Sequence, residues 1–432
     1  MIAILGGGES GIGAALLAAK MGKEVFVSDM GAISGPFKQV LRKHHIPFEE
    51  KGHSIEKIKS AEEVIKSPGI PPDAAIVQAI EAKGIPIIGE IEYAYRHCQG
   101  RIIAVTGSNG KTTTTNLVHH LLSEAGMKVS KCGNVGHSFA KAVMLEEPDY
   151  YVVELSSFQL EDIVSFRPDI AIITNISPDH LDRYRYDIEQ YARAKFRIAM
   201  NQRTGDVLII GSLDAPLKKV LYEMAPSPQK IEVGSGQANR IQIEGTTYMK
   251  YQNPSLRGRH NGQNASCAVA AAQKVGLTEE DIRRGLETFV NDPHRMEEVA
   301  NIGGVRYIND SKATNVDAVY YALDAMEGPV IWIAGGVDKG NDYTQLYEVL
   351  HNNVKALICL GKDNEKLTEA FKGKIQTIKE AHSMEEAIQL AKKIAQEGDT
   401  ILLSPACASF DLFDNYMHRG DVFRTLTKKI NE

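Results

Sequence analysis

The sequence of 432 residues has little cysteine, a single tryptophan and no excess of positive charge. Its five cysteines include no CxxC spacing, and their odd number cannot pair completely, so we expect reduced thiols rather than a disulfide framework. The formal net charge of −6 argues against a nucleic-acid partner. No apolar run approaches the ~20 residues that cross a bilayer, and the N-terminus lacks the basic region of a signal peptide. We therefore expect a cytoplasmic protein without membrane insertion.

Three stretches of the chain each begin a new strand–loop–helix pattern, which is typical of α/β proteins. A length of 432 residues also exceeds what one hydrophobic core supports. We predict three domains: a Rossmann-like N-terminal domain over 1–92, a central P-loop ATPase-type α/β domain over 93–292, and a C-terminal Rossmann-like α/β domain over 293–432. Between 206 and 256, short alternating runs with Gly and Asn breaks predict β-hairpins. The Asp-Pro pair at 292–293 is a turn signal and supports the last boundary.

The segment IIAVTGSNGKTT at 102–113 combines a short apolar strand, a glycine-rich loop and the start of a helix. Its glycines allow backbone N–H groups to approach an anion, and Lys111 adds an ammonium group. The general P-loop has glycine where this chain has Val105, so the match is to the shorter form TGSNGKTT. The alternative is an ordinary glycine turn before a helix. We predict a loop that binds nucleoside triphosphate phosphates through Gly107, Ser108, Asn109, Gly110, Lys111, Thr112 and Thr113.

A second glycine-rich loop follows the first predicted strand, where Gly6, Gly8 and Gly11 satisfy the pattern GxGxxG. Asp29 ends the next strand, at the distance expected for a dinucleotide fingerprint. The predicted domain has room for only one mononucleotide-binding half, so three interpretations stay open. The loop binds a nucleotide or its diphosphate, binds NAD or FAD, or is a structural turn. Asp29 likewise has two interpretations. It accepts a hydrogen bond from a ribose or a uracil, or it is a plain turn residue at the end of a strand.

Two polar residues follow neighbouring predicted strands of the central domain. Glu154 ends the strand YYVVEL, and His180 lies in SPDHLD after the next strand. Because ligands bind at the carboxyl ends of parallel strands, Glu154 is placed to hold Mg²⁺ beside the Thr112 hydroxyl. A solvated glutamate and an exposed loop histidine are the alternatives.

Lys195 lies near the centre of the apolar face of the helix predicted over 187–200. A fully buried lysine is costly, and its pKa falls until the amine is neutral and nucleophilic. The alternative is a side chain whose stem lies on apolar surface while its ammonium group reaches water.

Three strand-end loops of the predicted C-terminal domain are rich in hydroxyl groups and lysine: NDSKATN at 309–315, GGVDKG at 335–340 and SPACASF at 404–410. Such loops at one sheet edge suit an anionic substrate, although each alone is also compatible with an ordinary polar loop.

These segments, in this order, resemble the Mur ligases of peptidoglycan synthesis. The resemblance covers essentially the whole chain and includes SPGI at 67–70, DHLDRY, YARAKFRIA, RHNGQN and PHR. TGSNGKTT is found across a superfamily that includes folylpolyglutamate synthases. ELSSFQLE and SPACASFD point to the branch that adds D-glutamate.

The resemblance implies an ATP-dependent amide ligase that joins D-glutamate to UDP-N-acetylmuramoyl-L-alanine through an acyl phosphate. We expect the protein to be a monomer. The resemblance also implies catalytic roles for Lys111, Glu154, His180 and Lys195. One Mg²⁺ is then held by Thr112 and Glu154, and a second by His180 and a carbamylated Lys195. The implied substrate contacts are Ser10, Asp29 and Gly69 for UDP, Asn134 for the muramoyl-alanine arm, Asn261, Asn264, Arg295 and Asp310 for ATP, and Thr314, Lys339, Ser409, Phe410 and Tyr416 for D-glutamate.

Two positions depart from the family pattern. Tyr416 stands where phenylalanine is expected, and the acidic residue of GGVDKG has unusual spacing, so only Lys339 is carried over from that loop.

Two alternative functions stay open. One is an amide ligase that adds another amino acid to a Mur precursor, or glutamate to a folate. The other is a non-catalytic protein that binds a nucleotide as a switch.

Overall fold

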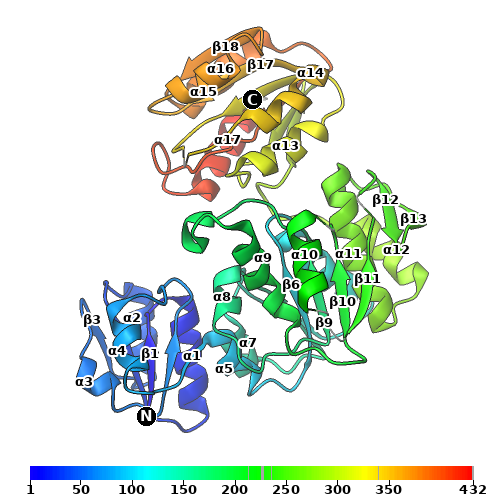
Figure 1. Cartoon of the computed structure of the whole chain (residues 1–432). Coiled ribbons are helices and arrows are strands. Elements are labelled where there is room, and N and C mark those ends of the chain that lie inside the picture. Colours follow the sequence, from blue (N-terminus) through cyan, green and yellow to red (C-terminus); the bar gives the residue numbers. More distant parts are fainter. Residues whose placement is uncertain (213, 225–227, 235, 339, 431–432) are drawn as a thin grey trace. The chain divides into compact units, whose positions relative to one another are not determined.

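The computed structural model describes residues 1–430 except 213, 225–227, 235 and 339. The helices and strands are labelled in Figure 1. They fall into two compact units. The first comprises Met1–Gly234, Ile243–Thr246 and Asn264–Leu286, and the second comprises Ser235–Gln242, Thr247–Gln263 and Glu287–Glu432. In the part of the chain that is described, no helix combines the length and apolar character needed to cross a membrane.

The first sheet of the first unit has five parallel strands in the order β3-β2-β1-β4-β5. Its strands are β1 Ile2–Leu5, β2 Val25–Asp29, β3 Phe48–Glu50, β4 Glu63–Lys66 and β5 Ile87–Gly89. Its helices are α1 Glu9–Lys20, α2 Gly35–Lys43, α3 Ile55–Ile58, α4 Ala75–Glu81 and α5 Glu90–Tyr95. Since β1 and β4 are neighbours, the glycine loop after β1 and the SPGI loop after β4 share one sheet edge.

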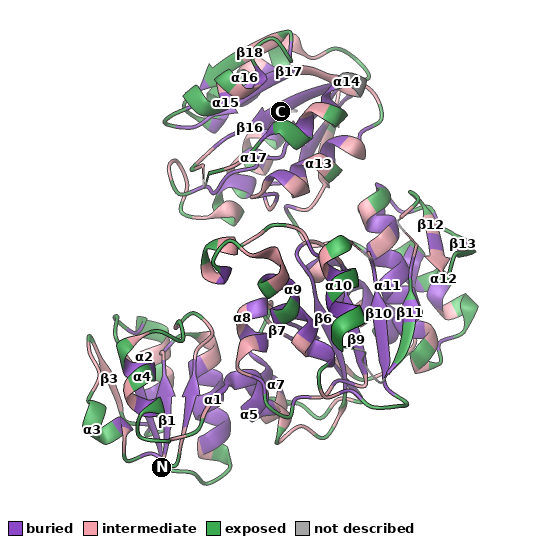
Figure 2. Ribbon diagram, viewed as in Figure 1, coloured by how far each residue is buried: buried purple, intermediate pink, exposed green. Residues whose placement is uncertain are grey.

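The second sheet of this unit has six parallel strands in the order β11-β10-β9-β6-β8-β7. Its strands are β6 Arg101–Thr106, β7 Val129–Gly133, β8 Tyr150–Glu154, β9 Ile170–Ile173, β10 Val207–Ile210 and β11 Gln229–Glu232. Figure 2 shows β6, β9 and β10 as buried strands, as expected for apolar runs in a parallel sheet covered by helices. The carboxyl ends of β6, β8 and β9 therefore meet at one edge.

The helices along this stretch are α6 Lys111–Glu124, α7 Phe139–Leu145, α8 Ser157–Glu161, α9 Ile188–Phe196, α10 Ala215–Met224, α11 Arg259–Val275 and α12 Glu279–Thr288. Short 3₁₀ turns are η1 Leu181–Tyr184, η2 Arg197–Ala199 and η3 Pro254–Leu256. One apolar cluster continues from the first sheet to the second, and within it α1 packs on α7. The predicted boundary at residue 92 falls inside α5.

The prediction of hairpins between 206 and 256 is wrong for the first part of that stretch. β10 and β11 are parallel members of the second sheet, and the hairpin is limited to β12 Arg240–Ile243 and β13 Thr246–Lys250. A four-residue apolar run such as VLII fits either arrangement, and its parallel partner β9 is too distant in sequence for the local pattern to reveal.

The second unit contains a six-stranded sheet in the order β14-β15-β19-β16-β17-β18, in which β14 is antiparallel and the other strands are parallel. Its strands are β14 Glu297–Ile302, β15 Val305–Asn309, β16 Val330–Ala334, β17 Val354–Leu360, β18 Thr377–Ala381 and β19 Thr400–Leu403. Its helices are α13 Val316–Asp324, η4 Thr344–Leu346, α14 Tyr347–Asn353, α15 Glu365–Phe371, α16 Met384–Ile394 and α17 Tyr416–Lys429. The adjacent order β15-β19-β16 brings the loops that follow these strands to one edge.

The predicted α/β class with parallel sheets is confirmed, while the exact limits 92 and 292 stay a prediction. The five cysteines are all free, as the sequence predicted.

Candidate active site

The phosphate-binding loop joins β6 to α6, and two of its positions require glycine. Gly107 has φ 146° and Gly110 has φ 82°, both in a region that other residues rarely adopt. A Cβ atom at Gly107 would overlap Thr174 Oγ1, and one at Gly110 would overlap Asn264 Oδ1. The strand–loop–helix arrangement predicted from TGSNGKTT is confirmed.

The loop that follows β9 holds the phosphate-binding loop in place. Asn175 accepts at its backbone oxygen from Ser108 N at 2.9 Å and at Oδ1 from Asn109 N at 2.9 Å. Thr174 Oγ1 donates to Asn109 O at 2.6 Å, and Ser108 Oγ donates to Ser177 O at 2.9 Å. These contacts fix the loop before any ligand binds. This role was not predicted, and the sequence indicates it only through the polar residues Thr174, Asn175 and Ser177 after a buried strand.

Lys111 and Thr112 begin α6. Lys111 Nζ donates to Gly107 O and to Ser108 O, each at 2.9 Å, so the ammonium group is folded over the loop. Thr112 is buried in the first turn of the helix. The N-terminal end of a 14-residue helix adds partial positive charge at the same point.

Glu154 is the last residue of β8 and is only 1% exposed. Its Oε1 accepts from Asn134 Nδ2 at 2.9 Å, while its Oε2 is buried without a hydrogen-bond partner. An unsatisfied buried carboxylate oxygen is costly, and a bound cation removes that cost. The Glu154 carboxylate therefore fits a divalent cation. Asn134, predicted to contact substrate, is held in position by a second hydrogen bond, which its backbone N–H donates to Glu154 O at 2.8 Å.

The predicted burial of Lys195 is confirmed, since this residue of α9 is 2% exposed. Its Nζ donates to Gly107 O at 2.7 Å and lies 4.6 Å from the centre of the Tyr191 ring. Burial lowers the pKa of Lys195 well below its ordinary value, and the nearby Lys111 charge lowers it further. A neutral amine can act as a nucleophile. Lys195 and Lys111 thus share the Gly107 carbonyl oxygen as acceptor.

His180 lies on the surface of the same unit, with 53% of its side chain exposed and a positive φ of 51°. Its Nε2 is 3.7 Å from Asp179 Oδ2, and its ring packs edge-on against Phe158 at 5.3 Å. Within the described residues, no three His, Cys, Asp or Glu side chains are grouped to hold a metal ion. The second metal site at His180 and Lys195 stays a prediction.

The glycine loop of the first sheet is fastened by Asp29. Its Oδ2 accepts from Gly7 N at 2.6 Å and its Oδ1 from Gly31 N at 2.7 Å. Asp29 therefore has a visible structural role, and a ligand contact stays a prediction. Ser10 lies in the first turn of α1, and Gly69 is exposed in the turn after β4.

In the second unit, Asp310 follows β15 and is buried. Its Oδ1 accepts from Met296 N at 3.2 Å and its Oδ2 from Ser404 Oγ at 2.9 Å. Burial raises the pKa of Asp310 to about 7, against the opposing effect of these hydrogen bonds and of the Arg295 charge. Asn261, at the start of α11, is buried and donates from Nδ2 to Arg257 O at 2.9 Å.

Arg419 of α17 connects strand-end loops of this unit through hydrogen bonds, and this role was not predicted from the sequence. It is 1% exposed. Its Nε donates to Ser311 Oγ at 3.0 Å, its Nη2 to Ser311 O at 2.9 Å and its Nη1 to Cys407 O at 3.1 Å. Burial lowers the pKa of Arg419 to about 10, so the guanidinium remains charged at neutral pH. The sequence did not indicate that Arg419 is buried, because α17 contains many polar residues and this arginine does not stand out among them.

The residues predicted to bind D-glutamate differ in exposure. Tyr416 begins α17, and Lys312 Nζ lies 3.8 Å from the centre of its ring. Ser409 is buried, Thr314 is half-buried and Phe410 is 71% exposed. Lys339 lies outside the described residues.

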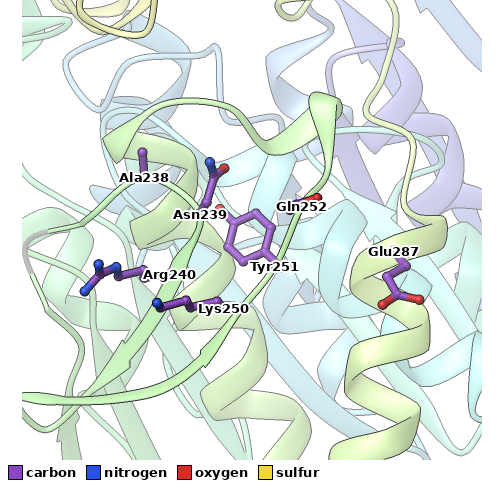
Figure 3. A pocket seen from close by; sticks show the side chains of 7 residues that line it. All are labelled: Ala238, Asn239, Arg240, Lys250, Tyr251, Gln252 and Glu287. Atoms are coloured by element: carbon purple, nitrogen blue, oxygen red, sulfur yellow. The ribbon is translucent and has the colours of Figure 1, made fainter.

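A separate cavity of about 570 Å³ lies in the second unit beside the β12–β13 hairpin (Figure 3). Its lining residues are Ala238, Asn239, Arg240, Lys250, Tyr251, Gln252 and Glu287. None of them is a predicted site residue.

Three family models match the chain in order. The MurD N-terminal domain matches residues 1–76, the Mur ligase middle domain matches 105–272, and the Mur ligase glutamate ligase domain matches 294–407. The sequence is 46% identical over 444 residues to the UDP-N-acetylmuramoylalanine--D-glutamate ligase of Christiangramia forsetii, with 99% of each chain covered. It is 47% identical over 441 residues to the enzyme of that name from Porphyromonas gingivalis, with 98% of this chain and 97% of the relative covered.

Solved structures share the fold at lower identity. UDP-N-acetylmuramate-alanine ligase from Thermotoga maritima superposes with a TM-score of 0.61 at 20% identity, and 99% of each chain is covered. Folylpolyglutamate synthase from Mycobacterium tuberculosis, solved with ADP, gives a TM-score of 0.60 at 17% identity over 76% of this chain and 91% of the other. The likeness to solved structures and the near-complete match to relatives agree with the order of site segments along the sequence. The chain belongs to the Mur ligase family.

Proposed function

We propose that this protein is an ATP-dependent ligase that joins D-glutamate to UDP-N-acetylmuramoyl-L-alanine in peptidoglycan precursor synthesis. The observation that carries the proposal is the preformed phosphate loop beside the buried carboxylate of Glu154, whose Oε2 has no protein partner. The printed names of relatives at 46% and 47% identity support the choice of substrates. We further propose a cytoplasmic monomer.

Each substrate is assigned to one part of the chain. Residues 1–92 take the UDP moiety at the glycine loop and the SPGI loop, and residues 93–292 take ATP at the phosphate loop. Residues 293–432 take D-glutamate at the loops that Arg419 ties together. The ADP bound to the folylpolyglutamate synthase supports nucleotide binding on this fold.

Mg²⁺ fits the Thr112 hydroxyl and Glu154, and when bound it neutralises charge on the phosphates. A second ion would use His180 and a carbamylated Lys195. The neutral Lys195 amine can add to CO₂ and lose a proton, which gives an anionic carbamate. The low pKa that burial imposes on Lys195 favours this step.

The proposed reaction has two steps. An oxygen of the alanyl carboxylate attacks the γ-phosphorus of ATP, and ADP leaves as the acyl phosphate forms. Lys111, held over the phosphate loop, stabilises the charge that develops on the transferred group. The amine of D-glutamate then attacks the acyl carbon and loses a proton, and inorganic phosphate leaves as the amide forms.

A single assay tests the proposal. The protein is incubated with ATP, Mg²⁺, UDP-N-acetylmuramoyl-L-alanine and, separately, D-glutamate, L-glutamate, L-alanine, L-lysine or meso-diaminopimelate. We expect one ADP and one amide product per turnover with D-glutamate alone. Product with another amino acid, or with a folate acceptor, would assign a different ligase. ATP hydrolysis without any joined product would assign a nucleotide-dependent switch.

A further inference from the structure

Lys66 is a buried cation at the end of β4, outside the predicted catalytic residues. It is 2% exposed, and its Nζ lies 2.7 Å from Asp162 Oδ2. The same Nζ donates to Ile70 O at 2.9 Å. One ammonium group therefore joins the end of the SPGI loop to the residue that follows α8.

The SPGI loop and the glycine loop touch where Lys66 lies. In the strand register, Lys66 pairs with Leu5 of β1 and with Gly89 of β5. Ser67 N donates to Leu5 O at 2.9 Å, and a Cβ atom at Gly6 would overlap Ser67 Oγ. A shift of the SPGI loop would thus disturb the glycine loop as well.

The helix α8 connects Asp162 to the ATP side of the site. Only Leu155 and Ser156 separate it from Glu154 at the end of β8, and Ser156 caps it with a capping box. At its far end, Glu161 accepts from Arg183 Nη2 and from Tyr184 Oη, each at 2.6 Å. Both donors lie in η1, which follows His180. The short helix α8 is therefore connected to three predicted site segments: the end of β8 at Glu154, the SPGI loop through Asp162 and Lys66, and the turn after His180 through Glu161.

A second carboxyl group, that of Glu90, lies close to the ion pair. Lys66, Glu90, Gln159 and Asp162 line one narrow gap together with Pro68 of the SPGI loop. Glu90 is 3% exposed, and its Oε2 has no hydrogen-bond partner. Burial raises the pKa of both carboxyl groups, to about 7 for Glu90. A partly buried ion pair of this kind contributes little net stability, so we infer that its role is to fix the geometry of the two segments that it joins.

We propose that Lys66 and Asp162 form a positioning pair that couples the SPGI loop to the Glu154 side of the site through α8. The inference rests on the proposed function, which gives the SPGI loop a UDP substrate to hold. Neither side chain needs to touch the reacting atoms. Loss of the pair leaves the catalytic groups intact but frees the SPGI loop, so that the UDP substrate is held less tightly.

Three variants test the pair: Lys66→Met, the isosteric Asp162→Asn, and the double variant Lys66→Met/Asp162→Leu. Lys83→Met, an exposed lysine of the same sheet region, is the matched control. We expect KM for UDP-N-acetylmuramoyl-L-alanine to rise about tenfold or more in all three, because a freed loop must be ordered again when the substrate binds. KM for ATP stays within about twofold of the wild type. A fourth variant, Lys66→Arg, should show a smaller rise in KM for the UDP substrate than Lys66→Met.

The double variant separates positioning from stability, because it removes both charges of the ion pair together and leaves neither partner alone. A raised KM in a double variant with wild-type melting temperature supports the pair as a positioning device. Wild-type KM in the double variant, or in Asp162→Asn, would overturn the proposal. If the wild type itself fails to add D-glutamate, the proposed function fails. UDP binding measured by calorimetry then decides the pair: unchanged affinity in the variants overturns it, and weakened affinity supports it.

Discussion

The phosphate-loop site of the first unit and the strand-end loops of the second unit differ in how their buried polar and charged groups are satisfied. In the first, Lys195 has a single hydrogen-bond acceptor, the Gly107 carbonyl oxygen, and Glu154 keeps one oxygen without a partner. In the second, Arg419 donates to the Ser311 and Cys407 loops, and both oxygens of Asp310 accept hydrogen bonds. Incomplete satisfaction beside a phosphate loop indicates groups that await a ligand. Complete satisfaction indicates groups that hold a framework.

The largest expected effect comes from Lys195→Ala, which removes the amine proposed to become a carbamate. We expect kcat to fall on the order of 10³-fold, the scale of losing a preorganised electrostatic group. Bicarbonate or a short carboxylate added to the assay should restore part of the rate. Arg193→Ala, on the exposed side of the same helix, is the control. Unchanged turnover in the Lys195 variant would contradict the carbamate.

The Lys111→Ala variant tests the second cation of the phosphate-loop site, since Lys111 donates to two carbonyl oxygens of that loop. Ligation should fall about 10²–10³-fold as the charge on the transferred phosphoryl group loses its partner. Binding of the UDP substrate, measured by calorimetry, should stay close to that of the wild type. Loss of both ATP and UDP-substrate binding would place the two nucleotides at one site and contradict the assignment of separate sites.

The Asp310→Asn variant tests whether ionisation of this buried carboxyl group lowers the free energy of unfolding, although each of its oxygens accepts a hydrogen bond. Burial raises the pKa of Asp310 to about 7, from an ordinary value of 3.8. Between these values the folded chain keeps a proton that the unfolded chain has lost, so the free energy of unfolding falls as pH rises. The difference corresponds to a penalty on the order of 4 kcal/mol above pH 7. Urea unfolding at pH 5 and pH 8 should show a smaller decline for Asp310→Asn, and an equal decline in both proteins would disprove the effect.

Arg419→Met should destabilise the second unit by about 3 kcal/mol, since several buried acceptors lose their donor. Arg419→Lys should recover little, because a single ammonium group cannot reach two loops as the planar guanidinium does. Thermal unfolding followed by calorimetry measures the effect, with Arg283→Met on the exposed face of α12 as the control. A stable Arg419→Met protein with a raised KM for D-glutamate alone would instead make Arg419 a substrate ligand.

The features that the sequence predicts well are those written in local patterns. The phosphate loop needs glycine, lysine and threonine at fixed spacing, and Lys195 reveals its burial through its place on an apolar helix face. The parallel strand β10 was missed because a short apolar run does not reveal its partner strand. Contacts made between distant segments were missed for the same reason, and they include the Asn175 hydrogen bonds, the Arg419 hydrogen bonds and the Lys66–Asp162 pair.

Transfer of isotope tests the central claim most directly. UDP-N-acetylmuramoyl-L-alanine labelled with ¹⁸O in its alanyl carboxylate is incubated with ATP, D-glutamate and the protein, and the phosphate released is analysed by mass spectrometry. An acyl phosphate that is attacked by the amine transfers one carboxylate oxygen to phosphate. We therefore predict one ¹⁸O atom in each phosphate formed and an amide product in equal amount. Unlabelled phosphate, with its new oxygen taken from water, would contradict carboxylate activation and the ligase assignment.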